Sequence, residues 1–165
     1  MKTILVPIDF SPVSRRVIDE AIDLARVAKA RLVLLHAVQL PAIVATDLAP
    51  LVGEALQLTA EVERGARRHL LRLQKSLVKR GVPVETLCAQ GFPTALIAAA
   101  AKKTGAKYIV IGSHGHTAFY DLVVGSTASG VLKRAPCPVV VVPAERKGKA
   151  RRLRRDKVNR PAILR

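Results

Sequence analysis

The stretch Thr3-Ile4-Leu5-Val6-Pro7-Ile8, followed directly by Asp9-Phe10-Ser11-Pro12, decides the fold of this chain. Its first six residues form a mostly apolar run without polar alternation, which predicts a strand that is buried on both faces. Ser11 is a favoured N-cap and Pro12 a favoured first helical residue, so we expect a helix to begin directly after the strand. The apolar face of that helix is predicted to consist of Val13, Val17, Ala21, Leu24 and Ala28.

Four further apolar runs follow along the chain, and helical patterns separate them. We expect strands at residues 31–38, 84–89, 107–111 and 138–142, and helices at residues 54–80, 93–104 and 126–134. The run at 84–89 alternates between apolar and polar residues, so we expect it nearer an edge of the sheet. The alternation of strands and helices predicts an α/β fold: a single doubly wound domain with a five-stranded parallel sheet and helices on both faces.

The helix at 54–80 is the longest predicted element, and Gly81 is expected to end it. Its Arg and Lys residues occupy the face opposite the apolar stripe, where a solvated surface is the expected role. The predicted buried face consists of Ala55, Thr59, Val62, Ala66, Leu70, Leu73 and Leu77. Residues 39–53 before this helix are read as a longer loop.

The charge of the chain is strongly positive and unevenly distributed. The 165 residues hold 28 Lys and Arg against 12 Asp and Glu, a formal net charge of +16, which raises nucleic acid or an anionic surface as partners. Half of this excess lies in the last stretch, so we divide the chain into a globular domain at 1–143 and a basic tail at 144–165. Aromatic residues make up only 3% and Trp is absent, which argues against a base-stacking surface.

Two further features concern the cellular compartment. The apolar run after Met1 is too short for the core of a signal peptide, and no stretch approaches the length of a membrane span. Cys88 and Cys137 lie far apart and lack the spacing of metal ligands, so we expect two reduced, buried thiols. These observations favour a cytoplasmic protein without a membrane span.

Two predicted strand ends carry groups suited to a ligand, because ligands of doubly wound sheets bind at the carboxyl ends of strands. The fourth strand is followed by Gly112-Ser113-His114-Gly115, and Gly125 precedes a helix that begins at Ser126-Thr127. Glycines permit close approach of backbone N–H groups, and a helix start attracts phosphate. Asp9 can accept hydrogen bonds from ribose hydroxyls or an adenine amino group. The alternatives are that the glycines only make turns, that Ser126 is an ordinary cap and that Asp9 caps the first helix.

The spacing Gly112-x2-Gly115-x9-Gly125-Ser126 resembles the nucleotide-binding motif of the universal stress protein family, in its ATP-binding branch. The five predicted strands also resemble those of the family in the same order, so the resemblance covers residues 1–143. It implies a strand order of 3-2-1-4-5 with ATP over the first and fourth strands. It further implies a homodimer that pairs through the edge strand Val139–Val142. It also implies a regulatory or stress-response role, in which protein partners recognise whether the nucleotide is bound.

The same resemblance assigns individual residues to ATP. It implies that Asp9 contacts the nucleoside with Pro7 and Ile8 beside it, and that Ala37 meets adenine through its backbone. It places Gly112, Ser113, His114 and Gly115 at the ribose and phosphates, and Gly125, Ser126 and Thr127 at the phosphates. His116 stands where relatives often have a basic residue; it either faces the γ-phosphate and makes affinity pH-sensitive, or lies exposed in a loop.

No residue set is typical of fast catalysis. A Ser-His-Asp arrangement, paired catalytic carboxylates and a Walker lysine are all missing from the sequence, so we predict neither catalytic nor metal-ligating residues. Slow ATP hydrolysis is one alternative. A true hydrolase or nucleotidyl transferase on the same scaffold is another; it would need bound Mg²⁺ and a positioned base, for which Asp9 and His116 are the only nearby candidates. His36 is read as a core histidine with a hydrogen-bond partner, and His69 as either structural or exposed. The tail from Arg146 to Arg165 leaves three alternatives: a solvated extension, a binder of nucleic acid or another anionic surface, or a segment that docks on its own dimer.

Overall fold

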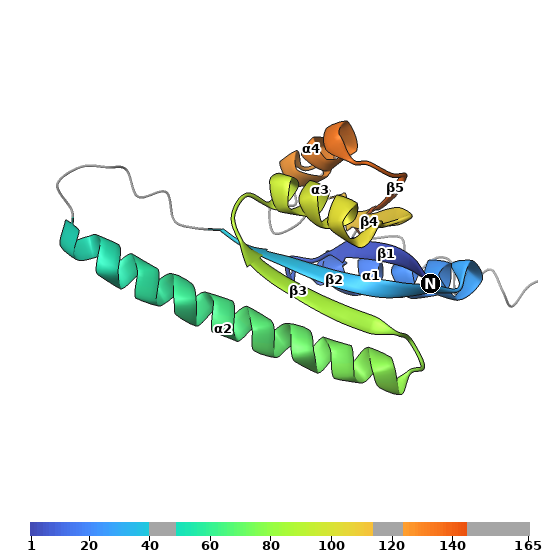
Figure 1. Ribbon diagram of the computed structural model, residues 1–165, viewed down its shortest axis with the longest axis horizontal. Helices are drawn as coiled ribbons and strands as arrows, with labels where there is room; N and C mark the ends of the chain where they lie inside the picture. The colour runs from blue at the N-terminus through green and yellow to red at the C-terminus, as the bar shows by residue number, and fades with distance from the viewer. Residues whose placement is uncertain (40–48, 114–123, 145–165) are drawn as a thin grey trace, which may run out of the picture.

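The structure is a computed structural model that describes residues 1–39, 49–113 and 124–144. Within these residues five strands alternate with four helices, as the sequence pattern predicts (Figure 1). Their order is β1 (Lys2–Pro7), α1 (Pro12–Ala28), β2 (Ala30–Val38), α2 (Ala49–Lys79), β3 (Val84–Gln90), α3 (Pro93–Thr104), β4 (Tyr108–Gly112), α4 (Ser126–Arg134) and β5 (Val139–Val142). Beyond Ala144, the predicted basic tail lies outside the described residues.

The sheet is parallel throughout, and its strand order β3-β2-β1-β4-β5 confirms the predicted one. β1 lies at the centre, where Leu5 is the partner of Val33 in β2 and of Ile109 in β4. β3 forms an edge, as its alternating pattern predicts. The chain winds outward from β1 in both directions, so the strand order reverses between β1 and β4. At such a point a doubly wound sheet leaves a crevice at the carboxyl ends of its strands.

Helices cover both faces of the sheet (Figure 1). α1 and α2 pack on one face, and α3 and α4 pack on the other. Along β1, Ile4 and Val6 belong to the core beneath α1 and α2, whereas Leu5 packs in the core beneath α3 and α4. A strand covered on both sides needs an apolar residue at every position, and this requirement explains the unbroken apolar runs of the sequence.

The start of α2 corrects one predicted boundary. The helix begins at Ala49, whereas the sequence pattern assigns residues up to Gly53 to a loop. Pro50 falls in the first turn, where its missing N–H is not needed for a helical hydrogen bond, so it does not prevent an early start. A glycine inside a helix is tolerated at a cost of about 1 kcal/mol, so Gly53 does not end it either.

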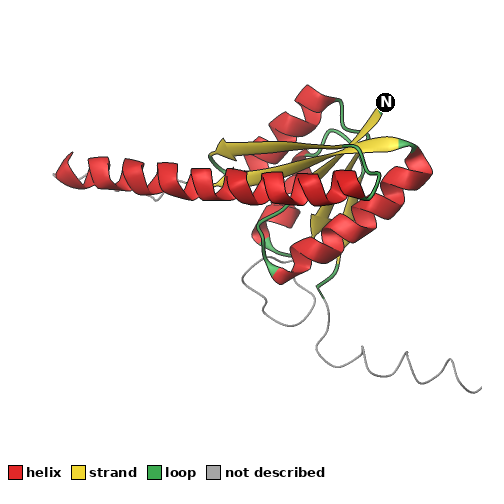
Figure 2. Ribbon diagram, turned by 90° about the horizontal axis from the view of Figure 1, so that it is seen from below, coloured by secondary structure: helices red, strands yellow, loops and turns green. Residues whose placement is uncertain are grey.

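α2 is longer than the strand beside it and extends beyond the sheet at its N-terminal end (Figure 2). Its 31 residues span about 46 Å, whereas the seven residues of β3 span about 23 Å. Gln90, the last residue of β3, donates a hydrogen bond of 2.5 Å to Glu63, so the turns before Glu63 lie past the sheet. Val62 is half exposed, although the periodicity predicts it in the buried face; it lies about 60° around the helix from the direction of the buried Thr59 and Leu77, at the margin of that face. Among the members of that face whose side chains are described, Thr59, Ala66, Leu70 and Leu77 are buried; the side chain of Ala55 lies outside the described part.

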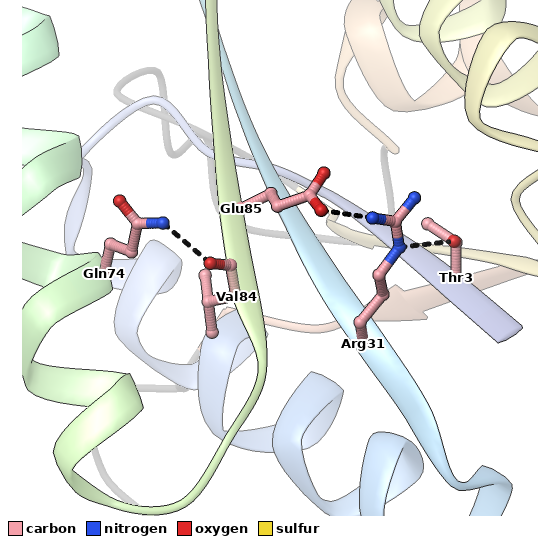
Figure 3. Close-up of polar contacts among 5 residues, drawn as sticks. All are labelled: Thr3, Arg31, Gln74, Val84 and Glu85. Atoms are coloured by element: carbon pink, nitrogen blue, oxygen red, sulfur yellow. Dashed lines mark hydrogen bonds and ion pairs between the residues drawn. The ribbon is translucent and has the colours of Figure 1, made fainter. Parts of the chain in front are cut away.

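Polar contacts hold α2 and the first three strands together at the end of the sheet that lies away from the crevice (Figure 3). Gln74 of α2 donates a hydrogen bond of 2.7 Å from Nε2 to the carbonyl oxygen of Val84. Arg31 of β2 donates from Nε to Thr3 Oγ1 of β1 at 3.1 Å and forms an ion pair with Glu85 of β3. None of the described helices is long and apolar enough to cross a membrane.

Candidate functional site

A cavity of about 340 Å³ opens at the carboxyl ends of β1, β2 and β4, where the strand order reverses. The first turns of α1, α3 and α4 surround it. This volume is within the roughly 300–1,000 Å³ that small-molecule sites in proteins occupy. Part of the wall is apolar and is formed by Val17, Leu35, Ile97 and Ile111. The remainder is polar and comes from the strand ends and the helix starts.

Asp9 lies in this cavity directly after β1, and three hydrogen bonds hold its Oδ1 atom. The backbone N–H of Ser11 donates at 3.0 Å, the hydroxyl of Ser11 at 2.5 Å and the hydroxyl of Ser14 at 3.0 Å. Since Ser11 is the N-cap residue of α1, the carboxylate stabilises the start of that helix. Asp9 therefore both lines the cavity and braces α1, so the geometry accommodates the two roles that the sequence leaves open.

The N-terminus of α4 borders the cavity through Ser126, Thr127 and Ala128. Gly125 is the N-cap residue and brings no side chain, and the first turn contains no acidic residue. Backbone N–H groups of a first helical turn lack intrahelical acceptors, and the helix dipole adds positive potential there. The hydroxyls of Ser126 and Thr127 are further donors. This side of the cavity is suited to an anion such as a phosphate.

Ser113 connects the elements that form the side of the cavity next to α4. Its N–H donates to the carbonyl oxygen of Val142 at 2.8 Å, and its carbonyl oxygen accepts from the N–H of Gly125 at 2.7 Å. Its hydroxyl oxygen accepts from the N–H of Ala144 at 3.3 Å. Ser113 thus ties the end of β4 to β5 and to the start of α4, and so fixes the first turn of α4 relative to the sheet.

The structure gathers most of the predicted site residues around this one cavity. Those that line it are Pro7, Ile8, Asp9, Ala37, Gly112, Ser113, Gly125, Ser126 and Thr127. His114 and Gly115 lie outside the described residues, as does His116. The common location of the nine residues is a structural finding; their contact with a nucleotide stays a prediction.

Three parts of the cavity were missed from the sequence. They are the first turns of α1 with Val13 and Ser14, Gln39 after β2, and the first turn of α3 with Pro93. The sequence does contain a signal for the α1 residues, because a helix that begins directly after a strand end must place its first turn beside that strand end. The α3 contribution had none, since the stretch Gly91-Phe92 before this helix carries no polar motif.

An aromatic stack braces the loop that carries Asp9. The ring of Phe10 lies between the imidazoles of His36 in β2 and His69 in α2, with both centroid distances at 4.3 Å. His36 Nδ1 lies 2.9 Å from the carbonyl oxygen of Ile8, and because a carbonyl only accepts, Nδ1 carries the proton. Phe10 adopts φ +61°, a left-handed conformation that is rare for a bulky residue. The structural role expected for His36, and the structural alternative for His69, agree with this arrangement.

Both cysteines are free thiols, but they are partly exposed, which corrects the expectation that they are buried. Cys88 lies in the edge strand β3 and Cys137 shortly precedes the edge strand β5, so each lacks a neighbouring strand on one side. Partial burial raises the pKa of both thiols above its ordinary value, which keeps them protonated and weakly nucleophilic at neutral pH. No cluster of three His, Cys, Asp or Glu side chains suited to a metal ion occurs in the part of the chain that the structure describes.

Comparison with known proteins agrees with this architecture. A model of the universal stress protein family matches residues 1–143. Universal stress protein A homolog 1 of Coxiella burnetii is 32% identical over 142 residues, which cover 86% of this chain and 95% of that protein. The structure of UspA from Lactobacillus plantarum is 30% identical with a TM-score of 0.71, over 86% of this chain and 97% of the other. A universal stress protein solved in complex with cAMP shares the fold at 19% identity and a TM-score of 0.55, over 86% and 96%.

Proposed function

This chain belongs to the universal stress protein family, and from that premise we propose that it is a dimeric regulatory module of the stress response that binds ATP. One observation carries the proposal: the cavity at the reversal of strand order combines an apolar wall, the carboxylate of Asp9 and the N-terminus of α4. An adenine nucleotide presents the matching chemistry, with a flat base, ribose hydroxyls and a phosphate chain. A relative of the same fold was solved in complex with cAMP, which supports this class of ligand.

The two sides of the cavity are proposed to bind different parts of the nucleotide, the base on the apolar side and the phosphates on the polar side. We place the base against the apolar wall beside Ala37, where backbone groups after β2 can recognise its edge. The carboxylate of Asp9, held by Ser11 and Ser14, then receives ribose hydroxyls. Phosphates lie at Gly125, Ser126 and Thr127, where N–H groups and hydroxyls converge on the start of α4. Mg²⁺ would bind through the phosphates, because the described residues offer it no dedicated ligand cluster.

Binding without rapid turnover is the expected behaviour. Among the described residues that line the cavity, Asp9 has the only titratable side chain, and its Oδ1 is engaged by three donors at the start of α1. A carboxylate that braces a helix is poorly placed to remove a proton from water. Slow ATP hydrolysis on the same scaffold is the second candidate, and turnover well above about 1 s⁻¹, the low end of ordinary enzymes, would favour it.

The nucleotide that copurifies with the protein tests the proposal. Mass spectrometry of the supernatant after mild acid denaturation of freshly purified protein should detect ATP in near-stoichiometric amount. Calorimetry with the emptied protein should then give affinities in the order ATP, ADP, AMP if the phosphate side contributes as proposed. A folded protein that neither carries a nucleotide nor binds added ATP would contradict the assignment, and preferential retention of AMP would exclude a role for the outer phosphates.

The edge strand β5 supports the proposed homodimer. It consists of four consecutive valines, and Val140 is 40% exposed. The carbonyl oxygens of Pro138 and Val142 accept hydrogen bonds from β4. Backbone groups alternate in direction along a parallel strand, so those of Val139 and Val141 point toward the open edge. An apolar strand with outward N–H and C=O groups is able to pair with a second copy of itself.

A further inference from the structure

The solvent-facing side of α2 carries a continuous row of positive side chains, here called the basic stripe. Its members are Arg64, Arg68, Arg72, Lys75 and Lys79. Spacings of four, four, three and four residues place all five within an arc of about 80° on the helix. Each is exposed, and the stripe lies opposite the side of the helix that is buried against the sheet. It extends over about 22 Å of helix at 1.5 Å per residue.

From Arg64 onward the stripe contains no negative charge, and the exposed Glu61 precedes it on the same face of the helix. Between Arg64 and Arg80 the sequence has no Asp or Glu at all. In the described part of the chain, one ion pair within α2 joins Arg67 to Glu63, and Arg80 directly after the helix pairs with Asp19 of α1, so neither pair involves a member of the stripe. α1 differs, because its exposed face mixes both signs and pairs Asp23 with Arg26. A solvated helix face ordinarily resembles that of α1.

Helix stability does not account for the stripe. Like charges four residues apart destabilise a helix by about 0.2–0.5 kcal/mol per pair, and the stripe contains three such pairs. Only Lys79 lies in the last turn, where a positive charge interacts favourably with the helix dipole. A bound polyanion would attract all five positive side chains and offset the repulsion between them. Binding of a polyanion therefore explains an arrangement that helix stability does not.

We propose that the basic stripe binds the phosphate backbone of a nucleic-acid duplex, independently of base sequence. Its length matches about six base-pair steps, and arginine forks suit phosphate oxygens. Insertion into a lipid surface does not fit, because the apolar face of α2, with Leu70 and Leu77, is buried against the sheet. Stacking on single-stranded bases does not fit either, since the chain has 3% aromatic residues and no Trp.

The stripe lies on a helix that is held firmly against the sheet, and it is separate from the nucleotide cavity. The hydrogen bond from Gln74 to the carbonyl oxygen of Val84 ties this half of α2 to β3 (Figure 3). α2 covers the face of the sheet opposite to α3 and α4 (Figure 1). The stripe therefore belongs to the folded domain and is distinct from the basic tail, whose cations begin at Arg146.

Full-length protein with all five stripe residues changed to Gln tests the proposal. The matched control changes Arg15, Lys102, Lys103, Lys133 and Arg134 to Gln, so that both variants lose five formal charges from the +16. Fluorescence anisotropy with unrelated 20-base-pair DNA and RNA duplexes is measured from 50 to 200 mM salt. For DNA, the magnitude of the slope of log K against log salt should fall by about 0.9 for each lost phosphate contact, which is about 4.5 for the five residues of the stripe variant, and by less than about one in the control.

Three results would overturn the proposal. Equal loss in the two variants would mean that only net charge matters. Loss on changing Arg151, Arg152, Arg154 and Arg155 to Gln, with no effect of the stripe variant, would assign binding to the tail. Stripe-dependent binding to vesicles with 30% phosphatidylserine, without binding to either duplex, would identify an anionic lipid surface instead. Circular dichroism of each variant should retain the helical content of the parent, since every changed side chain is exposed or lies in the tail.

Discussion

The backbone N–H of Gly125 donates a hydrogen bond of 2.7 Å to the carbonyl oxygen of Ser113. This contact joins the N-cap position of α4 to the end of β4 across residues 114–124. It holds the first turn of α4 against the cavity, beside the end of β4, where the strand order of the sheet reverses. Glycine at this junction has φ −56° and ψ 158°, a conformation open to every residue type. The absence of a side chain, rather than backbone freedom, is therefore the property to test.

Gly125→Val should reduce ATP affinity by about a hundredfold or more, roughly 3 kcal/mol, and leave the fold intact. The valine side chain would occupy space that the proposed phosphates need, without straining the backbone. Calorimetry gives the affinity, and thermal unfolding reports on the fold. Gly65→Val in α2 is the control, because nothing lies within 4 Å of the position its Cβ would take. Unchanged ATP binding by the Gly125 variant would show that the phosphates lie elsewhere.

Asp9→Asn should weaken ATP binding about tenfold and lower the free energy of unfolding by about 1 kcal/mol. The amide keeps the size of the side chain but removes the charge that strengthens the hydrogen bonds from Ser11 and Ser14. Chemical denaturation and calorimetry measure the two effects separately. Asp19→Asn is the control, since this exposed carboxylate has only a 3.8 Å ion pair with Arg80. A loss of stability without any loss of affinity would restrict Asp9 to its structural role.

Phe10→Leu should lower the free energy of unfolding by about 1–2 kcal/mol and also weaken ATP binding. The substitution removes stacking on both His36 and His69, and so loosens the loop that carries Asp9. The same change at Phe92, which is 85% exposed, is the control and should have little effect on stability. If affinity stays at the parent value while stability falls, the stack supports the fold but does not position the site.

The parts of this molecule that the sequence predicts are those encoded by local residues. The apolar runs, and the alternating pattern of β3, place every strand within one residue of its observed position, because burial on both faces demands continuous apolar character and an edge strand does not. The bounds of α3 and α4 follow from local signals as well, namely Pro93 and Gly105 for α3, and Gly125 and Pro136 for α4. The strand ends that line the cavity are likewise marked by glycines and one carboxylate.

Other features depend on contacts between distant residues, which no local pattern records. Phe10, His36 and His69 meet only because α2 packs along β2 and β3 and brings His69 to the ring of Phe10. Val62 is predicted in the apolar stripe but is half exposed, because it lies at the margin of the face that the fold buries. The wall supplied by α3 depends in the same way on tertiary packing. Periodicity predicts which face of a helix is apolar, but not how much of that face the fold buries.

Val140→Lys should convert the proposed homodimer to a monomer. A lysine on the short valine edge would place two like charges at the pairing of two β5 strands, and charged edges oppose strand association. Sedimentation equilibrium separates one chain of 17.8 kDa from two. The control is Leu87→Lys on the opposite edge strand β3, where the side chain is similarly exposed at 37%. A parent protein that is monomeric at micromolar concentration would remove the dimer from the proposed function.

Gly130→Ala should destabilise the protein when Thr94 is present and stabilise it when Thr94 is Ala. A Cβ on Gly130 of α4 would lie 2.9 Å from both Cγ2 and Oγ1 of Thr94 in α3. Overpacking costs about 1–3 kcal/mol, whereas alanine gains about 1 kcal/mol over glycine in a helix. Urea denaturation of the four proteins of this cycle should therefore show a reversal of sign. Equal effects in both backgrounds would mean that α4 moves away at no cost. The first turns of α3 and α4 both border the cavity, so the destabilised variant should also bind ATP more weakly.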